Sequence, residues 1–211
     1  MPLFYQHNIN ETTKLAVWHI TEKEDFFLEK VTIQKEIMHP HKRLQHLAGR
    51  YLLQILDPDF PFHLIEIAAS KKPLLSNGKI HFSISHCGNY AAAIISRDKL
   101  AGIDVELITP KIELVKEKFL RESELKLSKT AYAEPETASF WLLTLFWSAK
   151  EAIYKWHGKG ALSFKNNMSL NELHFENDHG FIDAYFIKET TTELKIQFRF
   201  FENLCLAWVV G

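Results

Sequence analysis

The order of helical and strand patterns constrains the fold of this chain more than any other feature of its sequence. Each half begins with segments of helical periodicity, which are followed by apolar or alternating segments between short turns. Helices are predicted over residues 22–35, 40–56, 112–118, 122–129 and 135–156. Strands are predicted over 14–20, 65–69, 80–85, 90–96, 100–107, 171–176, 181–187, 194–201 and 204–210. Helices and strands that are segregated in this way predict an α+β fold with antiparallel sheets.

Local signals place the ends of the first two helices. Thr21 and Glu24 have the capping-box spacing, which predicts a helix from about residue 22. Pro40 lies near the start of the second helix, and Asp57 follows its end. No low-complexity linker separates the two halves of the chain. We therefore expect two closely packed lobes with a cleft between them.

Composition excludes several classes of protein. The 25 Lys and Arg residues are balanced by 26 Asp and Glu residues, which argues against a broad nucleic-acid-binding face. No secretory signal opens the chain, and no run approaches the ~18 apolar residues of a membrane span. The two cysteines form no CxxC pair, so we expect a reduced, cytoplasmic protein. The 11 histidines include no HExxH motif, and a basic helix start is favoured over a metal site at His39, His41 and His46.

Two carboxylates alternate along the predicted strand GIDVEL. Because side chains of a strand point to opposite faces in turn, Asp104 and Glu106 share one face, opposite Ile103 and Val105. Paired carboxylates suit a hard divalent cation such as Mg²⁺. An ordinary half-buried strand with a solvated face accounts for the same pattern.

The longest predicted helix carries a second polar group. Glu151 and Lys155 are four residues apart and share a face, with Trp147 one turn before them. Glu151 could complete a three-carboxylate metal site, and Lys155 could hold a phosphate oxygen. The alternative is a surface ion pair worth about 0.3–0.5 kcal/mol.

A third candidate site lies in the segment FSISHCG. Ser85 and His86 are neighbours at the end of a predicted strand, so their side chains point to opposite faces and cannot form a hydrolase dyad. No GxSxG elbow is present either. The functional interpretation is that His86 donates to a phosphate or substrate, and the alternative is a histidine in a satisfied turn.

Four motifs in order resemble the 4'-phosphopantetheinyl transferase superfamily, in its larger, single-chain, Sfp-like form. They are KPLL, HFSISHCGNYAAAIIS, AGIDVELI and FWSAKEAIYKWHGKG. Together with the upstream segment KRLQHLAGR, the resemblance covers about residues 40–162. The upstream segment KRLQHLAGR is similar to the basic helix of that family. One departure is Ser83, where many members have Asn, which puts in doubt any contact made by that side chain.

The resemblance implies a fold of two similar α+β lobes related by a pseudo-twofold axis, here residues 1–100 and 101–211, with the active cleft between them. It also implies roles for ten residues of this chain. Asp104, Glu106 and Glu151 would bind Mg²⁺. His86 and Lys155 would contact the pyrophosphate of coenzyme A, Ser85 would contact a phosphate nearby, and Arg43 and Lys72 would bind the 3'-phosphate and adenosine end. Lys150 would support the site, and Glu124 aligns with a carboxylate proposed as a base in some members.

The implied reaction moves the 4'-phosphopantetheine group of coenzyme A to a serine of an apo acyl or peptidyl carrier protein, with Mg²⁺, and releases 3',5'-ADP. The sequence does not choose between carriers of fatty acid, polyketide and nonribosomal peptide biosynthesis. A monomer is expected, because the cleft can form within one chain. Two alternatives stay open: a metal-dependent phosphoesterase acting on CoA-like pyrophosphates, and a non-catalytic module that only binds carrier proteins.

Overall fold

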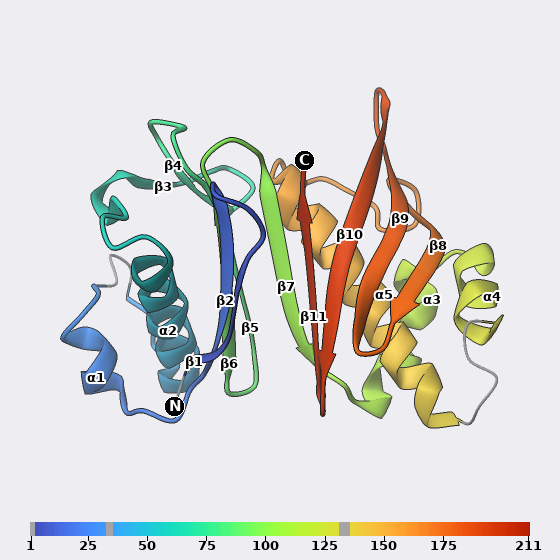
Figure 1. The fold of residues 1–211 in the computed structure, drawn as a ribbon, viewed down its shortest axis with the longest axis horizontal. Coiled ribbons are helices and arrows are strands. Elements are labelled where there is room, and N and C mark those ends of the chain that lie inside the picture. Colours follow the sequence, from blue (N-terminus) through green and yellow to red (C-terminus); the bar gives the residue numbers. More distant parts are fainter. Residues whose placement is uncertain (1–2, 33–35, 131–135) are drawn as a thin grey trace.

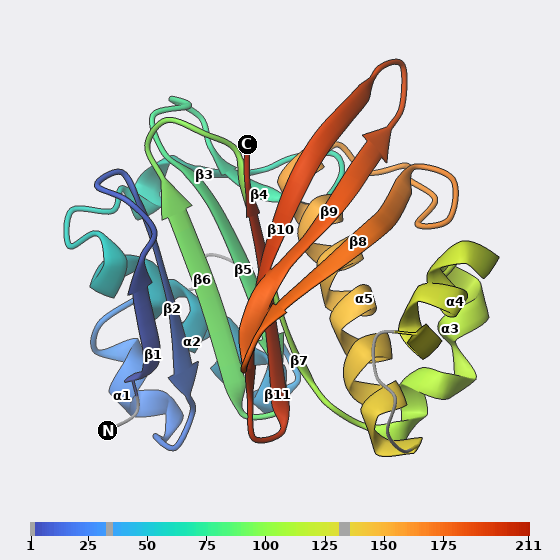
Figure 2. The ribbon, with the colours of Figure 1, turned by 45° about the vertical axis from the view of Figure 1, so that its right-hand side comes forward.

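Two antiparallel sheets lie side by side, and each is covered by a long helix on its other face (Figures 1 and 2). The computed structural model describes residues 3–32, 36–130 and 136–211. For residues 129–130 and 136–139 it describes the backbone only. The α+β class and the antiparallel sheets predicted from the sequence are confirmed. Among the described helices, none combines the length and the apolar character needed to cross a membrane.

The first sheet and its helix are built from the first half of the chain. The sheet has the order β1-β2-β6-β5. Its strands are β1 (Leu3–Asn8), β2 (Thr13–His19), β5 (His81–Cys87) and β6 (Tyr90–Ser96). Helix α2 (Pro40–Leu56) covers one face, with Pro40 in its first turn, as the sequence indicated. The His39 side chain, which was not predicted as a cap, accepts from the Lys42 N–H. The short pair β3 (Ile65–Ile67) and β4 (Pro73–Leu75) stands apart.

The second sheet is formed by strands that follow residue 100. Its order is β7-β11-β10-β9-β8. The strands are β7 (Ala101–Leu107), β8 (Met168–Glu176), β9 (His179–Ile187), β10 (Thr191–Phe201) and β11 (Leu204–Val210). Helix α5 (Glu136–His157) packs on this sheet, and the short helices α3 (Lys116–Phe119) and α4 (Glu122–Thr130) precede it. Because the two sheets differ in strand number and order, the halves share a design of helices on a sheet without being copies.

The predicted first helix is wrong in length. Helix α1 spans only Glu24–Leu28, its N-cap is Lys23, and no side chain caps it. The capping-box prediction fails because the Glu24 carboxylate accepts from Arg43 Nε and Nη2, at 2.6 and 2.9 Å, instead of turning back to its own helix. Residues 33–35 of the predicted helix lie outside the described residues. Strand β1, an edge strand exposed over much of its length, was not predicted.

An apolar layer joins the two sheets. Leu15, Val17, Ala92 and Ile94 of the first sheet pack with six fully or nearly fully buried residues of β7 and β11. These six are Ala101, Ile103, Val105, Leu204, Leu206 and Trp208. The buried apolar area on both sides fixes the sheets against each other without a linker.

Small polar side chains connect the neighbouring edge strands β5 and β7. The Ile103 N–H donates to Ser83 Oγ at 3.2 Å, and the Leu107 N–H donates to Cys87 Sγ at 3.5 Å. Between them, Ser85 Oγ donates to Asp104 Oδ1 at 2.8 Å. We call this contact, made by Ser83, Ser85 and Cys87, the seam. It satisfies polar groups at two sheet edges that share no backbone ladder.

Helix α5 approaches β7 closely at Gly102. A Cβ on Gly102 would lie 2.1 Å from the Ala152 carbonyl oxygen and 2.6 Å from the Trp156 nitrogen, both backbone atoms of α5. A side chain at this position would therefore push the helix away from the strand. Gly102 sets the distance between the carboxylates of β7 and those of α5.

The first prediction tests this close approach. Gly102→Ala should lower the free energy of unfolding by about 3 kcal/mol or more, because backbone atoms cannot move aside as a flexible side chain can. Urea denaturation provides the measurement. Gly211→Ala is the control, since its Cβ would meet the Leu194 side chain at an ordinary 3.6 Å, and should stay within about 0.5 kcal/mol of the wild type. Equal losses for the two variants would contradict the assignment.

Candidate active site

A groove of about 200 Å³ lies between the two halves of the chain. One wall is formed by residues 70–73, around the turn from β3 to β4, and by residues 82–84 of β5. The other wall comes from the end of α5, with Tyr154 and Lys155, and from Gly158 and Gly160 beyond it. A groove with a lysine on each wall suits an anionic ligand.

Asp104 is the buried centre of the polar cluster beside this groove. Its Oδ1 accepts from Ser85 Oγ at 2.8 Å and from Lys155 Nζ at 2.7 Å, and only 2% of the residue is exposed. Its Oδ2 is buried without a hydrogen-bond partner in the described part of the chain. The interpretation of this strand face as an ordinary solvated one is therefore wrong, and so is that of Lys155 as half of a surface pair with Glu151.

Glu106 and Glu151 belong to the same electrostatic cluster. Trp147 Nε1 of α5 donates to Glu106 Oε1 of β7 at 3.0 Å. This hydrogen bond is a second polar contact between the strand and the helix. Burial, followed by repulsion from Asp104, raises the pKa of Glu106 and raises the pKa of Glu151 to about 7. That Glu151 of α5 joins the pair on β7 in one metal site stays a prediction.

The donor set fits a hard divalent cation. Three carboxylates supply the oxygen ligands that Mg²⁺ prefers, and Asp104 Oδ2 has a free lone pair in a buried place where an unpaired oxygen is costly. Within the described residues, however, these three side chains are not a set whose ligand atoms all lie within 4.8 Å of one another. A cation that used all three would have to draw in at least one of the flexible glutamate side chains.

Lys72 contacts the end of α5. Its Nζ donates to the Lys155 carbonyl oxygen and, at 3.4 Å, to that of Trp156, while Ser70 Oγ donates to the Gly158 carbonyl oxygen at 2.5 Å. We call Ser70 and Lys72 the clamp. Burial lowers the pKa of Lys72 to about 8. The clamp was missed because nothing local in the sequence marks a contact between positions more than 80 residues apart.

His86 and Arg43 are held on the α2 side of β5. The His86 ring lies 5.2 Å from that of His46, and burial, then the nearby His46, lowers the pKa of His86. As alternation requires, it faces away from Ser85, and it lies within β5 and not in a turn. Arg43 is held by Glu24 and by the Ile37 carbonyl oxygen, at 2.9 Å. Arg43 does not line the groove, so its contact with a phosphate stays a prediction.

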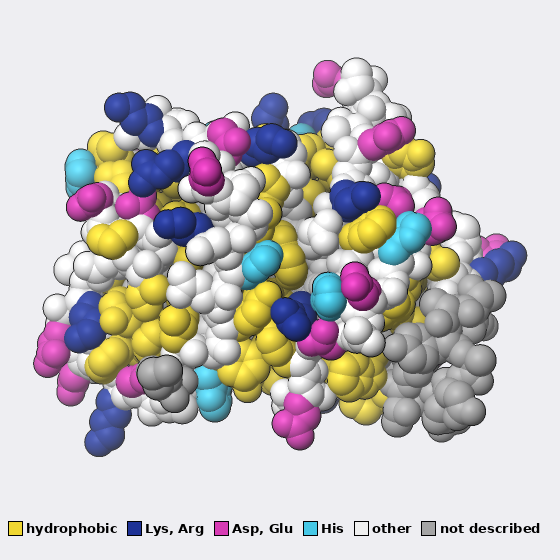
Figure 3. Space-filling model, in the orientation of Figure 1, with side chains coloured by type: hydrophobic (Ala, Val, Ile, Leu, Met, Phe, Trp, Pro, Cys, Tyr) yellow, Lys and Arg dark blue, Asp and Glu magenta, His cyan; other side chains and the backbone are white. Residues whose placement is uncertain are grey.

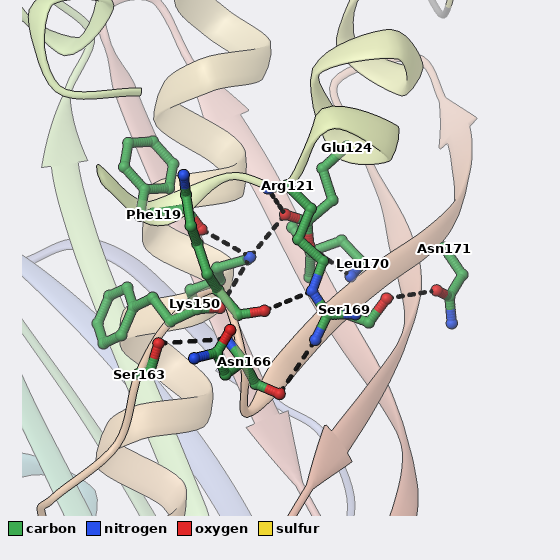
Figure 4. A network of polar contacts seen from close by, with 11 residues as sticks. Phe119, Arg121, Glu124, Lys150, Ser163, Asn166, Ser169, Leu170 and Asn171 are labelled. Carbon is green, nitrogen blue, oxygen red and sulfur yellow. Dashed lines mark hydrogen bonds and ion pairs between the residues drawn. The ribbon is translucent and has the colours of Figure 1, made fainter. Parts of the chain in front are cut away.

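Glu124 and Lys150 form a separate, fully buried ion pair (Figure 4). Lys150 Nζ donates to Glu124 Oε2 at 2.7 Å and to the carbonyl oxygens of Phe119 and Phe164. The Glu124 oxygens also accept from the backbone N–H groups of Arg121 and Leu170. All three ammonium protons and both carboxylate oxygens are thus used.

The structure therefore places Glu124 and Lys150 in the core of the second half and not at the groove. Burial lowers the pKa of Lys150 to about 8, and the other charges that act on it are those of Glu124, Arg121 and Lys165, not those of the groove carboxylates. Glu124 has no exposed surface, and both of its oxygens are used by groups of the protein itself. The alignment of Glu124 with a catalytic base is not supported by its surroundings, which give it a structural role.

Comparison with known proteins identifies the family of this chain. A family model described as the 4'-phosphopantetheinyl transferase superfamily matches residues 101–209, just over half of the chain. The chain belongs to this superfamily, as its motifs indicated.

Two curated relatives carry the same description. The chain is 33% identical over 98 residues to the 4'-phosphopantetheinyl transferase psf-1 of Bacillus pumilus, covering 46% of this chain and 40% of that protein. It is 29% identical over 125 residues to the 4'-phosphopantetheinyl transferase AcpT of Salmonella typhimurium, covering 57% of this chain and 62% of that protein. The matched regions thus span less than two thirds of either relative.

The second prediction separates a structural Glu124 from a catalytic one. Glu124→Gln leaves the Lys150 charge buried opposite a neutral amide, which should lower the free energy of unfolding by about 3–5 kcal/mol. Replacing both residues, as Glu124→Leu with Lys150→Met, should restore part of that loss. Glu122→Gln breaks the exposed pair with Lys126 and should change stability by less than about 0.5 kcal/mol. Unchanged stability with loss of activity in Glu124→Gln would instead indicate a catalytic role.

The third prediction concerns the clamp and pH. In the unfolded chain Lys72 keeps its proton up to about pH 10.5, whereas in the folded chain it loses the proton near pH 8. Between these two pH values the unfolded chain therefore binds more protons than the folded one. The stability of the wild type relative to Lys72→Met should therefore rise as pH increases through this window. Urea denaturation across the window measures it, with Lys71→Met, an exposed neighbour, controlling for the lost charge. A difference that falls or stays flat contradicts the burial of the ammonium.

Proposed function

We propose that this chain transfers the 4'-phosphopantetheine group of coenzyme A to a serine of an acyl or peptidyl carrier protein. The observation that carries the proposal is the cluster of Ser85, Asp104 and Lys155 beside the groove, with Glu106 and Glu151 coupled to it, in a member of this superfamily. Coenzyme A carries a pyrophosphate and a 3'-phosphate, and both require cationic partners. The proposed partners are thus coenzyme A and a carrier protein of fatty acid, polyketide or nonribosomal peptide biosynthesis. We further propose that this protein is a monomer and acts in the cytoplasm.

Asp104, Glu106 and Glu151 would hold the Mg²⁺ of this reaction. The free Oδ2 of Asp104 supports this. Burial, and after it the negative charge of Asp104, raises the pKa values of Glu106 and Glu151, so a cation bound here would relieve an unfavourable charge. When bound, the cation supplies a positive charge next to the phosphate whose bond is broken. The protein's own contribution is to hold the oxygen ligands at one place between β7 and α5.

Lys155 is placed to stabilise the phosphates directly. About 24% of its side chain is exposed, so the ammonium can reach a ligand while it stays paired with the nearly buried Asp104. Negative charge builds on the phosphate and on the departing 3',5'-ADP, and a fixed ammonium stabilises this charge more than mobile water does. Ser85 Oγ is hydrogen-bonded to both Lys155 and Asp104, so it fixes the position of the two charged groups. It would lie near the same phosphate.

The remaining residues would bind the rest of coenzyme A. His86 would donate to a pyrophosphate oxygen, and the negative charge there would raise its pKa from the lowered value of the free protein. Arg43 keeps N–H donors beyond those used by Glu24 for a 3'-phosphate. Lys72 would line the adenosine end and hold α5 in place. With Glu124 buried, Glu151 and water remain the acceptors of the serine proton.

The fourth prediction is tested by weighing an apo carrier protein after incubation with coenzyme A and Mg²⁺. The wild type should add one phosphopantetheine mass to the carrier. Glu151→Gln should slow the transfer at least about a hundredfold without unfolding the protein. Lys155→Met should slow it as strongly and also lower the free energy of unfolding, because it leaves the buried Asp104 carboxylate without its cation. Glu193→Gln, on the exposed part of β10, is the matched control and should keep full activity.

Three outcomes would contradict the proposal. Consumption of coenzyme A with an unmodified carrier would indicate the phosphoesterase alternative. A carrier that is bound but never modified would indicate a binding module. Full activity of Glu151→Gln at ordinary Mg²⁺ would remove the metal assignment.

A further inference from the structure

A cluster of one histidine and two carboxylates lies on the outer face of the second sheet, away from the groove. Glu172 of β8 is the cross-strand partner of Asp183 of β9, and His174 follows two residues later on the same face of β8. Their ligand atoms all lie within 4.8 Å of one another. Strands β8 and β7 are at opposite ends of this sheet, so the cluster is separate from the carboxylates of the groove. Figure 3 shows histidine and acidic side chains together over these strands.

Among the described residues, neither carboxylate of this cluster forms an ion pair with lysine or arginine. Asp183 is paired with Lys195 in register, but the Lys195 ammonium lies 4.0 Å from the centre of the Phe181 ring. Among the described ion pairs, Glu172 and Asp183 have only His174 as a partner. Two carboxylates that share one imidazole present a net negative site to a cation.

The ring of His174 is held in place. It stacks on Phe181, its cross-strand partner, with ring centres 4.2 Å apart and an angle of 21° between the planes. All three residues of the cluster belong to paired strands and not to a loop. Their side chains therefore start from a backbone that is fixed by the sheet, as a metal site requires.

The three ligand atoms lie close enough together to reach one metal ion after small side-chain movements. His174 Nε2 lies 2.9 Å from Asp183 Oδ2 and 3.8 Å from Glu172 Oε1. Bonds of about 2.0–2.2 Å to zinc in a tetrahedral site place neighbouring ligand atoms about 3.3–3.5 Å apart. The two measured distances lie on either side of this range, so small side-chain rotations bring three ligands onto one ion. The long carboxylate side chain of Glu172, which is exposed, can make that adjustment.

We propose that His174, Asp183 and Glu172 bind a zinc ion, with water as the fourth ligand. One imidazole nitrogen and two carboxylate oxygens suit a borderline divalent metal better than Mg²⁺, which prefers oxygen ligands alone. On binding, the hydrogen bond between His174 Nε2 and Asp183 Oδ2 is replaced by one metal–ligand bond to each of these atoms. Any proton on Nε2 is released to solvent. The ion links edge strand β8 to β9 and stabilises the far end of the sheet.

The experiment is a titration of the full chain with ZnCl₂, followed by calorimetry, in excess Mg²⁺ that competes for the carboxylates beside the groove. The wild type should bind one zinc ion and melt at a higher temperature with zinc present. His174→Ala and Asp183→Asn should each weaken binding by at least about tenfold and lose the rise in melting temperature. Cobalt should give the intense visible absorption of a four-coordinate site in the wild type and not in His174→Ala.

His179→Ala is the matched control on the same sheet. His179 also has two acidic neighbours, but Glu176 is 3.8 Å from Nε2 and Asp178 is 3.1 Å from Nδ1, on different edges of the ring. One ion cannot use both nitrogens, so this variant should bind zinc as the wild type does. Glu151→Gln should also retain zinc. Absence of zinc binding, equal binding in His174→Ala, or a purely octahedral cobalt spectrum would each overturn the proposal.

Discussion

The contact of Lys155 with Asp104 is the interaction on which the arrangement of this site depends. A carboxylate that is 2% exposed is costly to bury unless a cation and hydrogen bonds compensate it. Lys155 and Ser85 provide both, at 2.7 and 2.8 Å. Because these three residues come from α5, β7 and β5, their contact also joins the two halves of the chain. The charge that would handle a phosphate is therefore part of what holds the groove together.

Backbone geometry controls the distance between α5, which carries Lys155, and the strands that carry Asp104 and Ser85. Gly102 lets the helix lie against β7, and the clamp formed by Ser70 and Lys72 fixes the carbonyl end of the same helix from the other half. The end of α5 is thus held by groups from both halves near Lys155. Catalysis by positioning depends on such restraint, because small displacements of a charged group strongly reduce its effect on a reacting phosphate.

Two lysines of α5 illustrate how one helix serves both core and groove. Lys150 and Lys155 stand in the same motif, and each pairs with a buried carboxylate. Lys150 meets Glu124 in a pair with no exposed surface, whereas Lys155 keeps part of its side chain open to the groove. Only the second arrangement leaves a charge that a ligand can reach. A motif that identifies the family thus combines a structural lysine with one suited to chemistry.

Local periodicity is enough to predict several features of this protein. Alternation along GIDVEL put Asp104 and Glu106 on one side of a strand, and helical spacing gave α5 its bounds within a residue or two. The tertiary structure alone decided which partner each polar side chain takes. Glu24 leaves its predicted cap for a bidentate contact with Arg43, and Glu124 is buried in the core opposite Lys150. In both cases the carboxylate takes a cation from a distant segment as its partner. Periodicity records which face a residue is on, but not what packs against that face.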